Sequence, residues 1–186
     1  MNYIVTGPIC SGKSTLLKIA KSYGFKIMKA DDIILTLYED KVIISKLKEA
    51  FKDYQFASSL KETIKSLFFE SSLNRRKIEN IFHPKVHEII GNELESNSNL
   101  LLELPPLRSN INFIKNYKSI FMDCDVQIRS ERFKERNSLD SINSFHKLND
   151  FQTDCLSIKS YCDIIIKNNH NINLLTNYFY KDIIKT

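Results

Sequence analysis

The sequence predicts an α/β fold in which helices cover both faces of a parallel β-sheet. Short apolar stretches of strand length alternate with longer stretches of helical periodicity along most of the 186 residues. The first apolar stretch also leads through a glycine-containing loop directly into a helix, which is how parallel strands are connected. A chain of this length can form one such core together with a small insertion.

The loop near the start of the chain has a defined spacing of glycine, lysine and hydroxyl residues. Residues 2–6 are expected to form a buried strand, and residues 16–21 are expected to form a helix with Leu16, Ile19 and Ala20 on one face. Between them stands Gly7-Pro8-Ile9-Cys10-Ser11-Gly12-Lys13-Ser14-Thr15, which fits G-x-x-x-x-G-K-[ST]. At average residue usage, the four fixed positions occur by chance in about 1% or less of such chains. We therefore interpret the segment as a phosphate-binding loop (P-loop).

A P-loop binds phosphate mainly through its backbone. Its inward N–H groups form a concave anion site, and the dipole of the following helix strengthens that site. The Lys13 ammonium can reach the β- and γ-phosphates, and the Ser14 hydroxyl can serve as one ligand of Mg²⁺. The expected nucleotide-binding residues of the loop are Cys10, Ser11, Gly12, Lys13, Ser14 and Thr15.

Composition limits the possible partners. The net charge of +5 suits a small polyanion and is too diffuse to indicate nucleic acid. The longest apolar runs are too short to span a bilayer. Because the first predicted strand begins at residue 2, we expect no signal peptide. The four cysteines are scattered, as in proteins of a reducing compartment. We expect a cytoplasmic protein, a monomer or weak homo-oligomer, that binds neither nucleic acid nor membrane.

Two adjacent carboxylates follow the second predicted strand, residues 25–28. Asp31 and Asp32 come directly after Lys29-Ala30. Ligands of open parallel sheets bind at the carboxyl ends of the strands, so this position suits a substrate site. One of the two aspartates could instead cap a helix over residues 33–39.

Residues 42–97 are predicted to be mostly helical, which is more than a simple crossover between parallel strands needs. A new helix is expected to begin at His83-Pro84, with the proline in its first turn. The chain is thus expected to be a single domain. The core is expected to comprise residues 1–40, 98–136 and 160–186. The helical insertion comprises residues 41–97, and kinases of this architecture use such an insertion to bind the phosphate acceptor. The lid comprises residues 137–159.

Three arginines lie on one face of a helix predicted over residues 126–137. Arg129, Arg132 and Arg136 are spaced by three and four residues. They could form a solvated face paired with Glu131 and Glu135, or they could clamp the transferring phosphoryl group. Further strands are predicted at residues 100–104, 119–123 and 162–166, and a closing helix at residues 172–184.

Several motifs resemble those of the dephospho-CoA kinase family along nearly the whole chain. They are the P-loop, Lys29-Ala30-Asp31 at the family's D-A-D, the segment from Ile78 to Val86 with its His83-Pro84, Leu104-Pro105-Pro106-Leu107, Asp123 with Gln127, Arg132 and Arg136, and Gln152 with the segment from Cys162 to Asn168. The resemblance implies a three-layer P-loop kinase fold with a lid. It also implies transfer of the γ-phosphate of ATP to the ribose 3′-hydroxyl of dephospho-CoA, with ATP and Mg²⁺.

The resemblance also implies roles for individual residues. Asp31 would orient the acceptor hydroxyl or accept its proton, and orientation would be the larger effect because phosphoryl transfer is loose. Arg132 and Arg136 would meet the ATP phosphates from the lid. Lys61 and His83 would contact the acceptor, although His83 could equally be a helix cap or a packed side chain. The turn at Asn168-Asn169 would lie near the adenine.

Some residues depart from the family pattern. Lys29 replaces the first D-A-D aspartate, Ser109 replaces a glutamate, and Ile158 stands where a lid cation is usual. Lys61 replaces an arginine and loses bidentate phosphate geometry. Two alternatives therefore stay open: a P-loop kinase with another acceptor, and a catalytically weak or inactive ATP-binding protein. A GTPase switch is disfavoured because N-K-x-D and D-x-x-G are absent.

Overall fold

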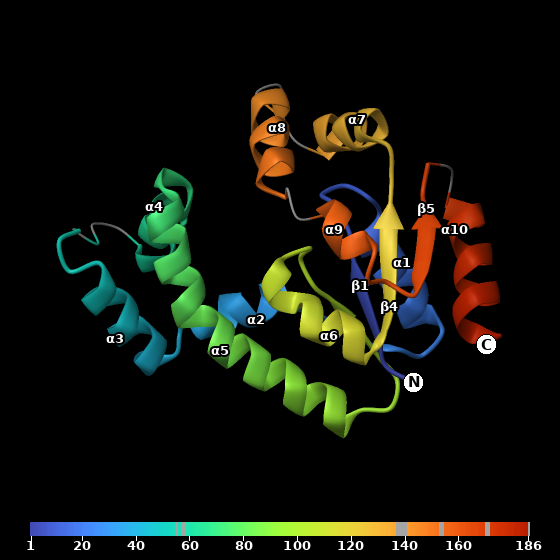
Figure 1. The fold of residues 1–186 in the computed structure, drawn as a ribbon, viewed down its shortest axis with the longest axis horizontal. Coiled ribbons are helices and arrows are strands. Elements are labelled where there is room, and N and C mark those ends of the chain that lie inside the picture. Colours follow the sequence, from blue (N-terminus) through green and yellow to red (C-terminus); the bar gives the residue numbers. More distant parts are fainter. Residues whose placement is uncertain (55, 57–58, 137–140, 153–154, 170–171, 186) are drawn as a thin grey trace. The chain divides into compact units, whose positions relative to one another are not determined.

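The structure is a computed structural model that describes residues 1–54, 56, 59–136, 141–152, 155–169 and 172–185 (Figure 1). The chain forms two compact units. The first comprises residues 1–29 and 97–186, and the second comprises residues 30–96. In the described part of the chain, no helix is long and apolar enough to cross a membrane.

The first unit is built on a five-stranded sheet in the order β2-β3-β1-β4-β5. All neighbouring strands run parallel, which confirms the predicted sheet. Because β1 lies in the middle, the loop that leaves its carboxyl end is flanked by the ends of β3 and β4. The strands are β1 (Tyr3–Thr6), β2 (Lys26–Lys29), β3 (Leu100–Glu103), β4 (Lys118–Asp123) and β5 (Ile164–Lys167).

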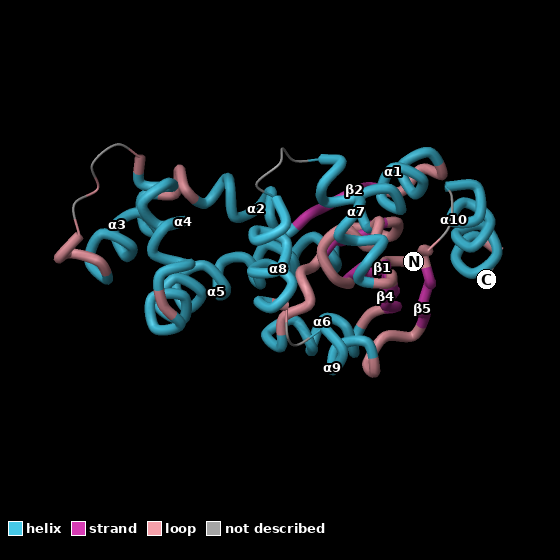
Figure 2. Tube along the Cα trace, turned by 90° about the horizontal axis from the view of Figure 1, so that it is seen from above, coloured by secondary structure: helices cyan, strands magenta, loops and turns pink. Residues whose placement is uncertain are grey.

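Helices cover both faces of this sheet. Figure 2 shows the strands between α1 (Lys13–Ser22) and α10 (Ile172–Phe179) on one side and α6 (Ile111–Asn116) and α9 (Cys155–Lys159) on the other. The three predicted layers are therefore present. The remaining helical segments of this unit are η1 (Arg108–Asn110), α7 (Val126–Arg136), α8 (Ser141–Phe151) and the π-helical turn η2 (Tyr180–Ile184).

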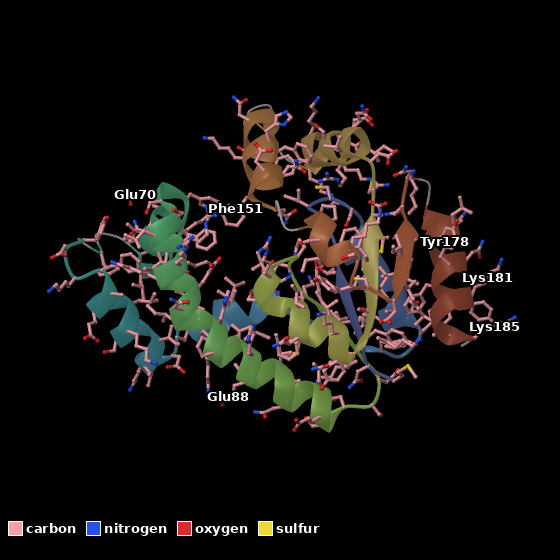
Figure 3. The ribbon with its side chains drawn as sticks, viewed as in Figure 1. Glu70, Glu88, Phe151, Tyr178, Lys181 and Lys185 are labelled. Carbon is pink, nitrogen blue, oxygen red and sulfur yellow. The ribbon has the colours of Figure 1, made fainter. Side chains whose placement is uncertain are left out.

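The main hydrophobic core lies between the sheet and the pair α1 and α10. Side chains alternate along a strand, so Tyr3 and Val5 of β1 face this core together. α10 and η2 bury Leu175, Phe179 and Ile183 at intervals of four residues. On the opposite side of the same helix, Tyr178, Lys181 and Lys185 point away from the sheet (Figure 3). The core holds β1 and α1 firmly, and thereby both ends of the P-loop.

The second unit contains only helices among its described residues, as predicted. They are α2 (Ala30–Leu37), α3 (Lys41–Ala50), α4 (Leu60–Glu70) and α5 (Ser72–Ser96). The side chain of Asp40 accepts hydrogen bonds from the first turn of α3, and Ser59 does the same for α4. The apolar faces of these helices form a core of their own, which includes Ile33, Leu37, Ile43, Leu47, Ile64, Leu67, Ile78 and Phe82.

Two sequence predictions about this unit are wrong. No helix begins at His83-Pro84, because α5 runs continuously through Pro84. A proline inside a helix removes one backbone hydrogen bond, but a buried stripe on both sides of it holds the helix together. That stripe comprises Ile78, Phe82, Val86, Ile90 and Leu94. α2 begins at Ala30, so Asp31 and Asp32 lie within its first turn rather than before it.

The predicted domain division stays a prediction. The observed units divide at residues 29 and 97, whereas the expected insertion begins at about residue 41. Much of the expected lid is helical, in α8 and α9, while residues 137–140 and 153–154 lie outside the described residues.

Candidate active site

The P-loop has the backbone that its glycines predict. Gly7 and Gly12 have φ of 139° and 102°, values that side chains disfavour. A Cβ on Gly7 would lie 2.5 Å from the Met122 carbonyl oxygen of β4, and one on Gly12 would lie 2.1 Å from Nδ2 of Asn168. Both positions therefore require glycine for conformation and for space. Cys10 also has a positive φ of 60°.

Side chains bind each carbonyl of the loop from Gly7 to Ser11. The Lys13 ammonium donates to the oxygens of Gly7 and Pro8, at 2.9 and 3.0 Å. The remaining three carbonyls accept hydrogen bonds from Arg129 (Ile9 oxygen, 3.3 Å), Arg132 (Cys10 oxygen, 3.4 Å) and Asn168 (Ser11 oxygen, 2.8 Å).

These contacts determine where the loop's amides point. In a trans peptide, the carbonyl and the next N–H point in opposite directions, and the structure has no cis peptide among its described residues. With the Ile9 and Ser11 oxygens held from outside, the N–H groups of Cys10 and Gly12 point to the inner side of the loop. Inward amides at the start of a helix are the arrangement that phosphate sites use. The phosphate site itself stays a prediction.

Lys13 is the expected phosphate-binding cation, and it is half-buried. Besides its two carbonyl partners, its ammonium lies 3.8 Å from Oε1 of Glu103 at the end of β3. Ser14 is exposed at the first turn of α1, so its hydroxyl is accessible. The Ser11 hydroxyl is buried and has no hydrogen-bond partner among the described residues.

The arginines of α7 divide into two kinds. Arg129 is only 7% exposed, and its Nε also donates to the Cys124 carbonyl, at 3.1 Å. Its burial lowers its pKa, but a guanidinium stays charged at neutral pH. Arg132 also donates to the Asn168 carbonyl, at 3.0 Å. These contacts contradict the solvated-face alternative for both residues. Arg136, in contrast, is exposed.

Residues of the expected lid also contact the core of this unit. Oε1 of Gln152 accepts a hydrogen bond from the Ile9 amide at 2.7 Å. Lys159 forms an ion pair of 2.8 Å with Asp123 at the end of β4, whereas Ile158 is fully buried. Position 158 is therefore part of the packed interior, and the neighbouring Lys159 is paired with a carboxylate of the sheet.

Cys10 lies among these cations. Burial raises the pKa of its thiol, although the positive charges of Arg136, Lys13, Arg129 and Arg132 act in the opposite direction. The thiol is therefore protonated at neutral pH, and Cys10 contributes to the site through its backbone rather than as a thiolate.

Asn169 has partners that the sequence did not indicate. Its side chain accepts from the Asp125 amide at 3.0 Å and donates to the Asp125 carboxylate at 2.7 Å. It therefore fixes the turn after β5 to the start of α7. Its expected position near the adenine stays a prediction.

The expected acceptor residues belong to the helical unit. Asp31 and Lys61 are exposed, in the first turns of α2 and α4. His83 is half-buried in α5, and its ring stacks on that of His87 with centroids 5.7 Å apart. Burial, and to a lesser extent the neighbouring His87, lower the pKa of His83. Its imidazole is therefore neutral at pH 7 and can donate or accept a hydrogen bond.

Sequence reasoning missed some of the residues that shape the site. The roles of Asn168 and Glu103, and the contact of Gln152 with Ile9, depend on pairs separated by 90 to 157 positions along the chain. The available signal was that Glu103 is the last residue of β3 and that Asn168 directly follows β5, so both lie at the carboxyl ends of strands. Gln152 directly follows α8 and had no such signal.

The parallel sheet, the P-loop at the end of its middle strand and the surrounding cations define a P-loop kinase. Solved structures agree with this fold. A protein of Thermus thermophilus has a TM-score of 0.78 at 20% identity and covers all of this chain and 97% of its own. A shikimate kinase of Acinetobacter baumannii has a TM-score of 0.60 at 17% identity, and covers 99% of this chain and 93% of its own.

Sequence comparison identifies the family. The dephospho-CoA kinase family model matches residues 3–173. A dephospho-CoA kinase of Prochlorococcus marinus subsp. pastoris is 30% identical over 193 residues, which cover 95% of this chain and 92% of the relative. The dephospho-CoA kinase structure of Campylobacter jejuni has a TM-score of 0.69 at 24% identity, with 99% and 96% coverage. The chain belongs to the dephospho-CoA kinase family.

Proposed function

We propose that this protein transfers the γ-phosphate of ATP to the 3′-hydroxyl of the ribose of dephospho-CoA, giving CoA and ADP in the last step of coenzyme A biosynthesis. The observation that supports this most strongly is the P-loop, whose carbonyls are bound by Lys13, Arg129 and Asn168. The family match of the chain adds the identity of the acceptor. The reaction would take place in the cytoplasm, and neither nucleic acid nor membrane is needed for it.

The phosphate-binding roles fall to the first unit. The backbone of Cys10, Ser11, Gly12 and Thr15 would hold the β- and γ-phosphates, and Lys13 would exchange its carbonyl partners for phosphate oxygens. Arg136 is exposed and suits the charge that develops on the transferred group. Arg132 donates hydrogen bonds both to the loop and to the turn after β5. Its guanidinium would stabilise the negative charge of the ATP phosphates.

The residues present fit a magnesium ion held mainly through the nucleotide. The Ser14 hydroxyl is exposed beside Lys13 and would be the protein's ligand, while phosphate oxygens and water would complete an octahedral shell. The ion would neutralise charge on the transferring phosphoryl group. The buried, unpartnered Ser11 hydroxyl is a further donor within the loop.

Asp31 would orient the acceptor hydroxyl and receive its proton late in the reaction. The position of Asp31 supports this assignment: it lies two residues after the end of β2 and is exposed in the first turn of α2. Lys61 would attract the acceptor's phosphates as a point charge, and the neutral His83 would form a hydrogen bond with the acceptor. These assignments rest on the family's motifs and on exposure.

An acceptor screen tests the function. The protein is incubated with Mg-ATP and, separately, with dephospho-CoA, shikimate and several nucleosides, and each acceptor is weighed by mass spectrometry. We expect dephospho-CoA alone to gain one phosphoryl group. A different phosphorylated acceptor, or ADP formation with no phosphorylated acceptor, would contradict the proposal. Lys13→Ala, prepared in parallel, shows whether a contaminating kinase contributes.

A further inference from the structure

Asn168 is a buried polar residue that joins three parts of the first unit. It follows β5 directly and is 7% exposed. Its backbone N–H donates to the Asp123 carbonyl at 2.7 Å, which continues the pairing of β5 with β4. Its carbonyl accepts from Arg132 at 3.0 Å, and its carboxamide donates to the Ser11 carbonyl at 2.8 Å. The sheet therefore fixes the backbone of Asn168, and Asn168 fixes the P-loop.

The contact with Ser11 controls the peptide that precedes Gly12. Because that peptide is trans, holding the Ser11 oxygen at Asn168 directs the Gly12 N–H away from Asn168. Gly12 packs so closely on the carboxamide that a Cβ there would lie 2.1 Å from Nδ2. A flip of the Ser11–Gly12 peptide would break the hydrogen bond between the buried Asn168 carboxamide and the Ser11 carbonyl, which is unfavourable.

Its neighbour Asn169 has a different environment. Asn169 is less buried, and both side-chain hydrogen bonds that it forms with described residues are with Asp125. Of the two adjacent asparagines, Asn168 is the one whose side chain reaches the loop.

We propose that Asn168 is a positioning residue for phosphate binding. Its carboxamide holds the Ser11–Gly12 peptide so that the Gly12 amide faces the nucleotide's phosphates, and Asn168 itself contacts no substrate. This inference rests on the proposed function only in that the P-loop binds a nucleotide; it does not depend on the identity of the acceptor.

Two variants of Asn168 test the proposal. Asn168→Ala removes the donor, and Asn168→Asp keeps the size but places a carboxylate beside the Ser11 carbonyl and close to the phosphates. The dissociation constant of ADP is measured by calorimetry, and the ³¹P resonance of the β-phosphate is recorded at saturating ADP. The melting temperature without nucleotide shows that each variant is folded, and if the Ala variant does not fold, the isosteric Asp variant provides the test.

We expect ADP to bind about tenfold more weakly to Asn168→Ala, and more weakly still to Asn168→Asp. The β-phosphorus resonance of bound ADP should move toward that of free ADP in both variants. Asn99 provides the matched control, because its carboxamide also donates to a backbone carbonyl, that of Gly24, at 3.2 Å, but it is exposed and outside the loop. Asn99→Ala and Asn99→Asp should bind ADP as the wild type does.

The outcomes separate the alternatives. Unchanged ADP affinity in the Asn168 variants would overturn the proposal. Weaker binding with an unchanged β-phosphorus resonance would also overturn it. Asn168 would then affect ADP binding through the adenine or through the stability of the protein, and not through the phosphates. If the wild-type protein binds no ADP, the proposed function itself fails at the nucleotide site, which is a different result from either of these.

Discussion

Lys13 shows how the loop is prepared for a nucleotide. Its ammonium is held by the carbonyls of Gly7 and Pro8 and lies near Glu103. It is thus already oriented along the loop, and phosphate oxygens would take over from neutral carbonyls as its partners. The bonds of the ammonium to carbonyls are already charge-assisted on the donor side, and a phosphate oxygen adds a negative charge on the acceptor side, which favours the exchange.

Removing this cation should abolish phosphoryl transfer. We expect Lys13→Ala to lower kcat for ADP formation with dephospho-CoA about a hundredfold or more, because the charge on the transferring group loses a direct partner. Lys18→Ala is the control, since Lys18 is exposed on the same helix and outside the loop. Near-normal turnover of Lys13→Ala would refute the role of Lys13.

Asp31 and Asp32 share the first turn of α2 and are both exposed, so they form a matched pair. If Asp31 orients the acceptor hydroxyl, Asp31→Asn should lower kcat by several hundredfold, in the range of about 10²- to 10⁴-fold for general acid–base groups. The affinity for ATP should not change. Asp32→Asn should have turnover close to that of the wild type. Steady-state kinetics decide this, and equal losses in both variants would argue for a general effect of charge.

Among the elements, α7 carries both a buried arginine and an exposed arginine that we propose binds ATP. Its buried Arg129 holds the Ile9 and Cys124 carbonyls, while its exposed Arg136 extends into solvent. Only the first of these residues is part of the packed interior.

The two ends of α7 should therefore respond differently to alanine. Arg129→Ala should reduce the free energy of unfolding by about 1–3 kcal/mol, because buried carbonyls lose their partners. Arg136→Ala should change it by less than about 0.5 kcal/mol, as is usual at exposed positions, but it should raise the KM for ATP. Urea unfolding and kinetics measure both quantities. A destabilised Arg136→Ala with an unchanged KM would reverse the assignment.

α5 carries a group whose protonation opposes folding. Burial and His87 lower the pKa of His83, so below pH 6.5 the unfolded chain binds a proton that the folded protein resists. The neutral His83 imidazole therefore contributes fully to the free energy of unfolding when the pH is above the pKa of this histidine in the unfolded chain. This contribution decreases as the pH falls below that pKa.

Replacing His83 should weaken this acid sensitivity. Between about pH 7.5 and about pH 5.5, the free energy of unfolding should fall less for His83→Gln than for the wild type. His146→Gln, a change at an exposed histidine, should keep the wild-type slope. The test is urea unfolding at several pH values, and an unchanged slope for His83→Gln would show that another group is responsible.

For the molecule as a whole, local patterns predicted the sheet, the P-loop and the helical block, because each depends on residues close together in the chain. The helix start at His83-Pro84 was wrong because tertiary packing of the α5 stripe outweighs the local effect of a proline. The side chains that hold the loop carbonyls could not be predicted, because Arg129 and Asn168 are 120 and 157 positions from their partners in the loop and reach them only through the tertiary fold. No local pattern encodes such contacts.

The position of the transferred phosphate gives the decisive result. The product of a reaction with Mg-ATP and dephospho-CoA is purified and examined by ³¹P NMR with coupling to the ribose protons. We predict a new phosphomonoester whose phosphorus couples to the proton on the ribose 3′-carbon, and none with Lys13→Ala. A phosphate on another hydroxyl, or ADP and inorganic phosphate without any new ester, would contradict the proposed reaction.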